Sequence, residues 1–363
     1  MDLVAAPEMI RDSRADGPGL EPLSYPVYFV NPNTEKWGDL FDAAELPDPD
    51  LIYSRFSDSN DIWVVKTYLR LRSRGLDVRL VSELVPGAVN VVMNYNLLIK
   101  RLSYNCYVVA CRADTFRSTI SNHAIVQNPH NVLTATDHLI QHWPQPGLIP
   151  RDTARGSRLE TIVYKGSRLN LCAAFLDPGF ERRLREIGVA FRINEDPANF
   201  HDYRNCDVVL AVRDLTESDY FAKPASKLVN AWHGGVPALL GPEPAYQAMR
   251  KTPLDYIEIR SPEEAIRQII HLKENPELYR RMAENARVRA RQFTIDRIAA
   301  QWHEVLAGPV AEGFSTWSAQ SVLSKSLVRP IRFAAQAAQQ IREKRKYMHQ
   351  RDHGFRPISG RFT

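Results

Sequence analysis

Short apolar segments alternate with helical patterns along most of the chain, and this alternation restricts the fold more than any other feature. The strand candidates are 25–32, 51–54, 77–81, 90–93, 106–110 and 124–127 in a first run, and 160–164, 189–193, 207–212, 236–240 and 256–259 in a second. Strands that alternate with helices form parallel sheets with helices on both faces. The pattern therefore predicts an α/β fold.

A segment that suits neither a helix nor an inner strand separates the two runs. Residues 142–151 contain three prolines and a glycine, which interrupt regular structure. The 363 residues also exceed what one compact core usually holds. The expected parts are a flexible arm (1–24), a first αβ domain (25–141), a Pro-rich hinge (142–154), a second αβ domain (155–305), and a basic helix and tail (306–363).

Local signals set several helix ends. Apolar positions at helical spacing predict a helix over 62–74, which Gly75 is suited to end in the left-handed conformation. Ser261 followed by Pro262 indicates another helix start. Further helices are expected over 170–187, with a break at Pro178–Gly179, and over 226–233.

Composition excludes several classes of protein. With 44% hydrophobic and 25% charged residues, the chain resembles a soluble globular protein and not a disordered or fibrous one. Its four cysteines form no CxxC pair, which suits a reducing cytoplasm and offers no zinc ribbon. The longest apolar runs are too short for a membrane span, and the first residues do not read as a signal peptide. We expect a cytoplasmic location.

Positive charge is concentrated at the C-terminal end. Residues 321–363 carry ten Lys/Arg and two Asp/Glu, a net +8 in a chain whose formal charge is +5, so the rest is mildly acidic. The basic balance therefore does not indicate a nucleic-acid partner. Leu323, Leu327 and Ile331 recur at helical spacing between basic residues. Two interpretations remain. The segment is either a helix that lies on the anionic inner surface of a membrane, or a helix packed on the rest of the protein with a disordered end.

Residues 222–238 contain the clearest chemical signal. A helix is expected to begin at Ser226, after Pro224, and to lead through two glycines into a buried strand. A helix N-terminus presents free N–H groups and partial positive charge, which favour an anion. Ser226 adds a hydroxyl, and Lys223 and Lys227 add full charges, so the segment suits a diphosphate. The alternative is a capped helix with solvated lysines.

The stretches 224–228 (PASKL) and 235–238 (GVPA) resemble the donor-site helix of GT-B glycosyltransferases that use nucleotide sugars. The similarity covers about residues 155–305 and is only architectural over 25–150. It implies two Rossmann-like domains facing a cleft, the first for the acceptor and the second for a nucleotide-diphosphate sugar. The sugar nucleotide is a co-substrate, so no cofactor is expected. The resemblance also favours retention at the anomeric carbon.

The resemblance carries over to individual positions. Leu228 belongs to the motif, and Asn230 stands where many members have a Glu that binds the ribose hydroxyls. Glu243, after the next strand, is a candidate to replace that Glu. The donor-binding candidates are Lys165, Gly166, Arg168, Arg213, Lys223, Ser226, Lys227, Leu228, Asn230 and Glu243.

Two of these groups stand at expected strand ends. Lys165, Gly166 and Arg168 follow the first strand of the second domain, where open α/β sheets bind ligands. Gly166 allows close backbone approach, and the two cations can face phosphate oxygens; a solvated basic turn is the alternative. Arg213 ends the inner strand at the same edge, as a ligand contact or a surface charge.

The first domain offers candidate catalytic groups. Asp114 follows the strand at 106–110 and is either a base for an inverting reaction or a partner of Arg112. A histidine of this domain often faces the donor sugar in similar enzymes, and His123 and His130 are the candidates; a surface or packed histidine is the alternative. The histidines between 123 and 142 lack the pattern of a zinc site, so no metal is expected.

The leading hypothesis is a metal-independent glycosyltransferase of hexosyltransferase type. It would act on a glycan or lipid-linked acceptor in cell-surface polysaccharide or glycoconjugate synthesis, with Lys165, Arg168, Ser226 and Lys227 stabilising the leaving nucleotide. One alternative is a nucleotide-sugar epimerase, although no convincing carboxylate set is found. Another is a non-catalytic sugar-nucleotide or glycan-binding protein, which Asn230 keeps open.

Overall fold

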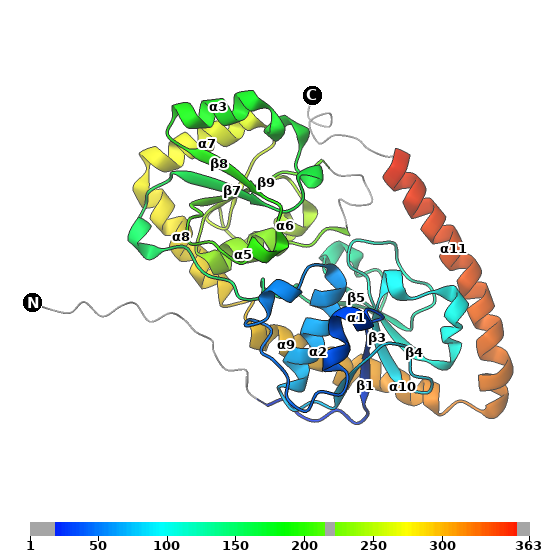
Figure 1. The fold of residues 1–363 in the computed structure, drawn as a ribbon. Coiled ribbons are helices and arrows are strands. Elements are labelled where there is room, and N and C mark those ends of the chain that lie inside the picture. Colours follow the sequence, from blue (N-terminus) through cyan, green and yellow to red (C-terminus); the bar gives the residue numbers. More distant parts are fainter. Residues whose placement is uncertain (1–18, 215–221, 354–363) are drawn as a thin grey trace, which may run out of the picture.

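The structure, a computed structural model, describes residues 19–214 and 222–353 and contains two parallel sheets (Figure 1). Most of the expected arm and the end of the tail lie outside these ranges. The first sheet has the strand order β2-β1-β3-β4-β5-β6. Its strands are β1 (Val27–Val30), β2 (Val78–Val81), β3 (Val89–Met93), β4 (Tyr107–Cys111), β5 (His123–Val126) and β6 (Asp137–Leu139).

The second sheet has the strand order β11-β10-β9-β7-β8. Its strands are β7 (Thr161–Lys165), β8 (Ala190–Asn194), β9 (Val208–Ala211), β10 (Ala238–Leu240) and β11 (Ile257–Glu258). Helices α3 (Pro178–Glu186) and α7 (Pro262–Glu274) pack together on one face, and α5 (Ser226–Gly234) and α8 (Pro276–Ala290) on the other. This confirms the expected α/β fold.

The strand order reverses once in each sheet. The reversal lies between β1 and β3 in the first sheet and between β7 and β9 in the second. Neighbouring strands at such a point send their chain crossovers to opposite sides, which opens a crevice at their carboxyl ends where ligands bind. A ligand-binding site is therefore expected at the carboxyl ends of these four strands.

Most predicted elements are present near their expected positions. Gly75 has φ +88° after α2 (Thr67–Arg72), and the Ser261 hydroxyl accepts from the Glu264 amide at 3.2 Å at the start of α7. The strand predicted at 51–54 is wrong, because Tyr53–Arg55 forms a single helical turn. The segment pairs with no strand of the first sheet, in which β1 lies between β2 and β3. The short β6 was not predicted.

The last helices return to the first domain. Ile298 and Trp302 of α9 (Ile295–Val305) are buried in the first domain's core, and α10 (Ala311–Ser318) follows after a kink at Gly308. We expected the second domain to run to residue 305, but its buried core ends at Phe293. The apolar face of α9 is what joins it to the first domain, and a sequence pattern does not say which core such a face covers.

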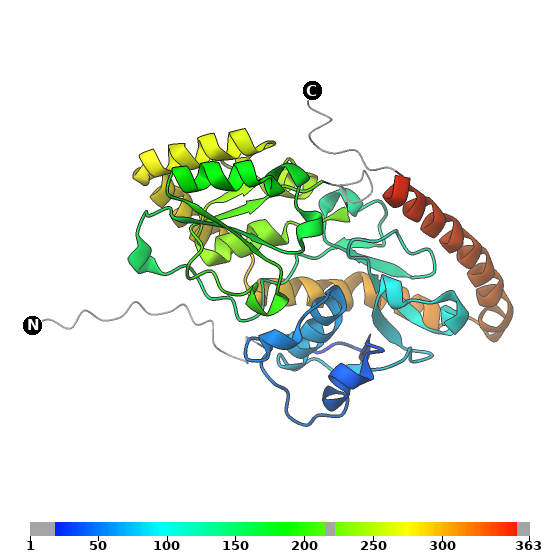
Figure 2. The same ribbon diagram turned by 45° about the horizontal axis from the view of Figure 1, so that its top comes forward.

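The basic tail is mainly a packed helix. Helix α11 (Arg329–His353) lies along one side of the first domain (Figures 1 and 2). Phe333 and Ala337 pack on Val92 and Val108 of that sheet. Gln340 accepts a hydrogen bond from the Thr119 amide at 2.7 Å. In the described part of the chain, no helix combines the length and apolar character needed to cross a membrane.

The Pro-rich segment is irregular and held on both sides. The Trp143 indole donates to Thr67 at 2.9 Å, and the buried Lys66 ammonium donates to the Pro144 carbonyl at 2.6 Å. Toward the second domain, the Gln145 amide donates to Asn230 at 2.9 Å. The connection between the domains is therefore ordered by contacts to each of them.

Candidate functional site

The N-terminus of α5 lies in the second domain without a side-chain cap. Ala225 occupies the N-cap position, so no side chain there accepts from the amides of the first turn. The Ser226 hydroxyl makes no hydrogen bond to the described residues. Leu228 is fully buried in the domain core and anchors the helix, so the structure gives it a packing position. An uncapped first turn retains N–H groups that an anion can accept from.

Lys227 joins α5 to the end of β7. Its ammonium lies 4.9 Å from the centre of the Tyr164 ring and donates to the Lys165 carbonyl. Gly166 has φ +143°, and a Cβ there would come within 2.9 Å of the Lys227 Nζ. Only glycine leaves room for this approach. The structure therefore brings Gly166 and Lys227 together.

Burial, together with the nearby Arg213 guanidinium, lowers the pKa of Lys227 to about 7. Lys223 and Lys165 act in the same direction, whereas Glu243 opposes them. An ammonium in this state gains from any anion placed beside it, because the anion offsets both the lost hydration and the repulsion. The helix start and Lys227 thus form one electropositive position.

Arg213 and Glu243 form a buried ion pair near Lys227. The guanidinium donates to both carboxylate oxygens, at 2.9 and 2.6 Å, and to the Tyr246 hydroxyl at 3.0 Å. Burial alone would lower the pKa of Arg213, but the Glu243 carboxylate raises it above its usual value. Both charges are satisfied internally, so Arg213 serves here to hold Glu243 and Tyr246 in place.

The side chains of the remaining donor-binding candidates contact other groups, away from the first turn of α5. The Lys165 ammonium donates to the carbonyls of Asn199 and Asp202, at 3.1 and 2.7 Å. Arg168 is exposed and 3.6 Å from Glu195. The Asn230 side chain accepts from the Gln145 amide of the linker.

Asp114 and Lys223 connect the two domains. The Asp114 carboxylate is 2.8 Å from the Lys223 ammonium and accepts from Gln127 at 3.0 Å. Burial raises its pKa, but Lys223 outweighs this and holds the pKa below its usual value. The preceding Ala113 has φ +48°, a strained conformation for a residue with a Cβ, and such strain gathers at functional sites.

His123 lies away from this edge. It begins β5, whereas Gln127 at the other end of the strand faces the second domain. Its ring contacts the Tyr107 hydroxyl at 2.8 Å and His138 at 2.8 Å. Burial, together with His138, lowers its pKa to about 4. The structure does not bring His123 to the donor position; His130, directly after β5, lies at the carboxyl edge.

The site also contains residues that the sequence did not single out. Gln127 and Asn128 reach across the domain boundary to the carbonyls of Ala222 and Lys223, at 3.4 and 3.2 Å. Gln127 ends the strand predicted at 124–127 and Asn128 follows it, and this position at a strand end is a signal that could have found them. Tyr164, at the end of the strand predicted at 160–164, was not singled out either, although its ring supports Lys227.

The first domain has its own polar group at the strand reversal. Asn31 follows β1 and Asn94 follows β3, and both are buried. The Asn31 Nδ2 and the Asn94 Oδ1 have no hydrogen-bond partner. Buried amide atoms without partners are costly unless a ligand or water supplies the bond.

At the level of sequence, no protein-family model and no curated protein matches the chain. The sucrose-phosphate synthase of Thermosynechococcus elongatus has a similar structure, with a TM-score of 0.52 at 12% identity over 77% of this chain and 98% of that one. HepE of Anabaena, in complex with UDP and glucose, gives 0.47 at 12% identity over 78% and 100%. TarM gives 0.42 at 12% identity over 60% of this chain and 54% of its own, about half its length.

Sucrose-phosphate synthase is a GT-B glycosyltransferase, and the chain has the GT-B fold. The likeness to sucrose-phosphate synthase confirms the expected architecture of two Rossmann-like domains. At this low sequence identity, the similarity shows a common fold and nothing further.

Proposed function

We propose that this chain is a glycosyltransferase that takes a sugar from a nucleotide diphosphate bound at the N-terminus of α5. The observation that carries the proposal is the uncapped start of α5 beside Lys227, whose pKa is lowered to about 7. This position lies at the strand reversal between β7 and β9. A diphosphate there would accept from the free amides and favour the charged ammonium.

The same groups suit the departure of the nucleotide. When the bond between the anomeric carbon and the diphosphate oxygen breaks, negative charge grows on the leaving oxygen. Lys227 and the helix amides would stabilise that charge, and Lys223 would join them if it leaves Asp114. These groups supply what a bound metal would otherwise supply, and we infer that the transfer of a hexosyl group needs no metal.

We infer retention at the anomeric carbon. An inverting reaction requires a base that can take the acceptor's proton. Asp114 is our candidate for that base, and its two oxygens are already engaged by Lys223 and Gln127. Retention does not require this carboxylate to act as a base, so the observed contacts favour it.

We infer that the acceptor hydroxyl binds in the first domain. Asn31 and Asn94 offer one free donor and one free acceptor at the strand reversal, which is what a sugar hydroxyl needs. We infer a glycan acceptor, carried on a lipid, in the synthesis of a cell-surface polysaccharide or glycoconjugate. The four cysteines are free and buried, which supports a cytoplasmic location.

A panel of nucleotide sugars tests the proposal. UDP, GDP, ADP and dTDP sugars are first ranked by thermal shift, and the best donor is incubated with glycan acceptors in the presence and absence of EDTA. We expect release of nucleotide and formation of a glycoside whose anomeric configuration matches the donor. Isomerised donor without transfer would indicate an epimerase.

A non-catalytic binding protein is the second candidate. It is favoured by Asn230, which is uncharged and engaged by the linker, and by Glu243, which is engaged by Arg213. This candidate predicts nucleotide-sugar binding without turnover by any acceptor.

A further inference from the structure

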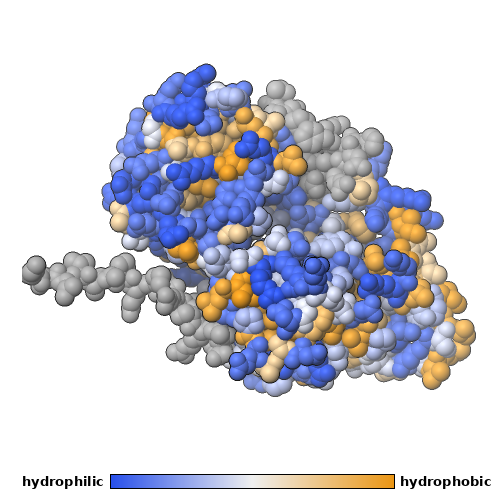
Figure 3. All heavy atoms as spheres, viewed as in Figure 1, coloured by the Kyte–Doolittle hydropathy of each residue, from blue (hydrophilic) through white to orange (hydrophobic). Residues whose placement is uncertain are grey.

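The turn between α10 and α11 exposes a group of large apolar side chains. Val322, Leu323, Leu327, Val328 and Ile331, which we call the α10–α11 patch, are between 45% and 81% exposed. In Figure 3 apolar residues gather at the corner where α10 leads into α11. A helix normally turns such side chains toward a core, so a run of them in solvent indicates a surface that meets something.

The packing of α11 explains why this face is free. Phe333, Ala337 and Gln340 recur at intervals of four and three, and they form the face that contacts the first domain. Ile331 lies on nearly the opposite side of α11, because it is two residues from Phe333 and two residues correspond to about 200° around an α-helix. One face of the helix therefore contacts the first domain, and the opposite face remains in solvent.

The surroundings of the patch are positively charged. No Asp or Glu occurs between residues 313 and 342, whereas Lys325, Arg329, Arg332 and Arg342 do. Lys325 and Arg332 form no ion pair with any residue that the structure describes. The patch therefore combines exposed apolar groups with cations that have no carboxylate beside them in sequence.

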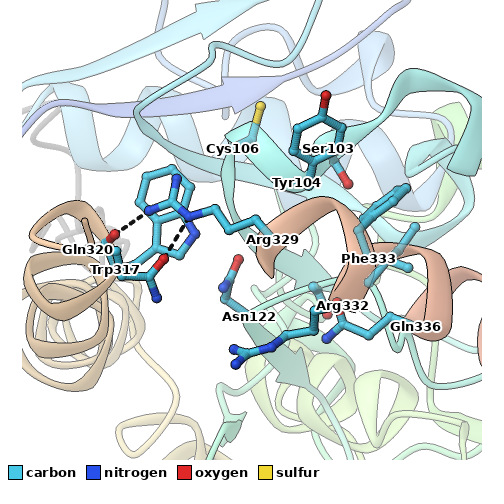
Figure 4. A pocket seen from close by; sticks show the side chains of 12 residues that line it. Ser103, Tyr104, Cys106, Asn122, Trp317, Gln320, Arg329, Arg332, Phe333 and Gln336 are labelled. Carbon is cyan, nitrogen blue, oxygen red and sulfur yellow. Dashed lines mark hydrogen bonds between the residues drawn. The ribbon is translucent and has the colours of Figure 1, made fainter. Parts of the chain in front are cut away.

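A pocket of about 90 Å³ lies between the end of α10, the start of α11 and the first domain (Figure 4). It is lined by Ser103, Asn122, Gln320, Arg329 and Arg332 among others, and no carboxylate lines it. Arg329 stacks on Trp317 at 3.7 Å and donates to Gln320, which leaves Arg332 available to a ligand. The Ser103 hydroxyl is buried and has no partner. These groups suit an anion such as a phosphate.

We propose that the α10–α11 patch docks on an anionic phospholipid bilayer, with its apolar side chains in the headgroup region and a lipid phosphate near Arg332. Apolar burial together with electrostatic attraction is how a helix binds in a membrane interface. A second copy of the chain fits less well, because a two-fold contact would bring Lys325 and Arg332 against themselves. The proposal does not depend on the glycosyltransferase reaction, since bilayer binding requires no sugar donor.

Vesicle co-sedimentation of the full-length protein tests the proposal. We expect binding to phosphatidylcholine vesicles containing about 30 mol% phosphatidylglycerol, weaker binding to pure phosphatidylcholine, and release as NaCl rises from about 0.05 to 0.5 M. Lys325→Gln and Arg332→Gln should each lower the partition coefficient roughly fivefold, since one basic residue near the surface contributes about 1 kcal/mol.

The apolar contribution is tested by the double variant Leu327→Asp, Ile331→Asp. Val288→Asp is the matched control, because Val288 is an exposed apolar residue, 49% accessible, on α8 of the other domain. We expect the double variant to lose vesicle binding and the control to keep it, with both melting like the parent protein by circular dichroism. Equal vesicle binding by all three proteins would overturn the proposal. A dimer in light scattering that the double variant dissociates, without vesicle binding, would also overturn it and would identify a second copy as the occupant.

Discussion

Asp114 and Lys223 form an ion pair of 2.8 Å that spans the two domains. Asp114 stands at the end of β4, and Lys223 stands three residues before α5. The Tyr347 hydroxyl of α11 donates to the Asp114 carbonyl at 2.7 Å. One residue therefore connects the first domain, the segment that leads into α5 and the C-terminal helix.

Asp114→Asn should tighten the binding of nucleotide diphosphates. The substitution removes the charge that holds Lys223 and frees the ammonium for the phosphates. An exposed or half-exposed pair is worth at most about 1 kcal/mol, so the gain should be no more than about fivefold in Kd by titration calorimetry. Unchanged affinity with complete loss of turnover would instead make Asp114 a catalytic base.

Lys227→Ala should weaken nucleotide binding by about 1–3 kcal/mol, the contribution of a charge-assisted hydrogen bond. Lys273→Ala is the matched control, because the exposed Lys273 also donates to a carbonyl, that of Ile187 at 2.7 Å, on another part of the same domain. Titration calorimetry of both variants measures the change in nucleotide affinity. If the two substitutions have the same effect, Lys227 is not a phosphate ligand.

Nucleotide binding should depend on pH through Lys227. Its pKa is lowered to about 7 in the free protein, so the side chain is largely neutral at pH values well above 7. A bound diphosphate raises that pKa, so binding takes up protons and affinity falls as the pH rises through 7. Calorimetry in buffers with different ionisation enthalpies measures this uptake. Lys227→Arg, which is always charged, should abolish it.

Glu243→Gln should destabilise the protein by about 3–5 kcal/mol, because it leaves the Arg213 charge buried without its partner. Glu195→Gln removes the exposed partner of Arg168 and should change the free energy of unfolding by less than about 0.5 kcal/mol. Urea unfolding of both variants provides the comparison. A small effect of Glu243→Gln would show that the pair is not required for folding.

Phe333→Ala should lower stability by about 3–5 kcal/mol, since Phe333 is buried against the first sheet. Ile331→Ala, two residues earlier and 70% exposed, should have an effect of at most about 0.5 kcal/mol. Thermal and urea unfolding measure both. Equal losses would mean that α11 turns its other face to the domain. Because α11 covers the sheet, removing residues 321–363 would also expose Val92 and Val108, so point substitutions are the cleaner test of the tail.

Much of the fold could be predicted because the relevant information is local. Gly75 ends a helix and Ser261 begins one because their own backbone and side chain satisfy nearby groups. The same holds for α5, whose start at Ser226 follows from Pro224 and the lysines around it. The failed strand at 51–54 shows where local information ends, since a short apolar segment becomes a strand only where tertiary packing pairs it with another strand, and here it forms a helical turn instead.

The sequence by itself determined the two αβ domains, the helix start at Ser226 and the basic tail, because periodicity, helix-end signals and charge are properties of neighbouring residues. Only the tertiary structure decided which candidates meet. It placed Lys227 over Tyr164 and paired Arg213 with Glu243. It also directed the Lys165 ammonium to backbone carbonyls and left His123 at the far end of β5. These outcomes depend on which buried charges find partners across the fold, and such contacts join residues that are distant in the chain.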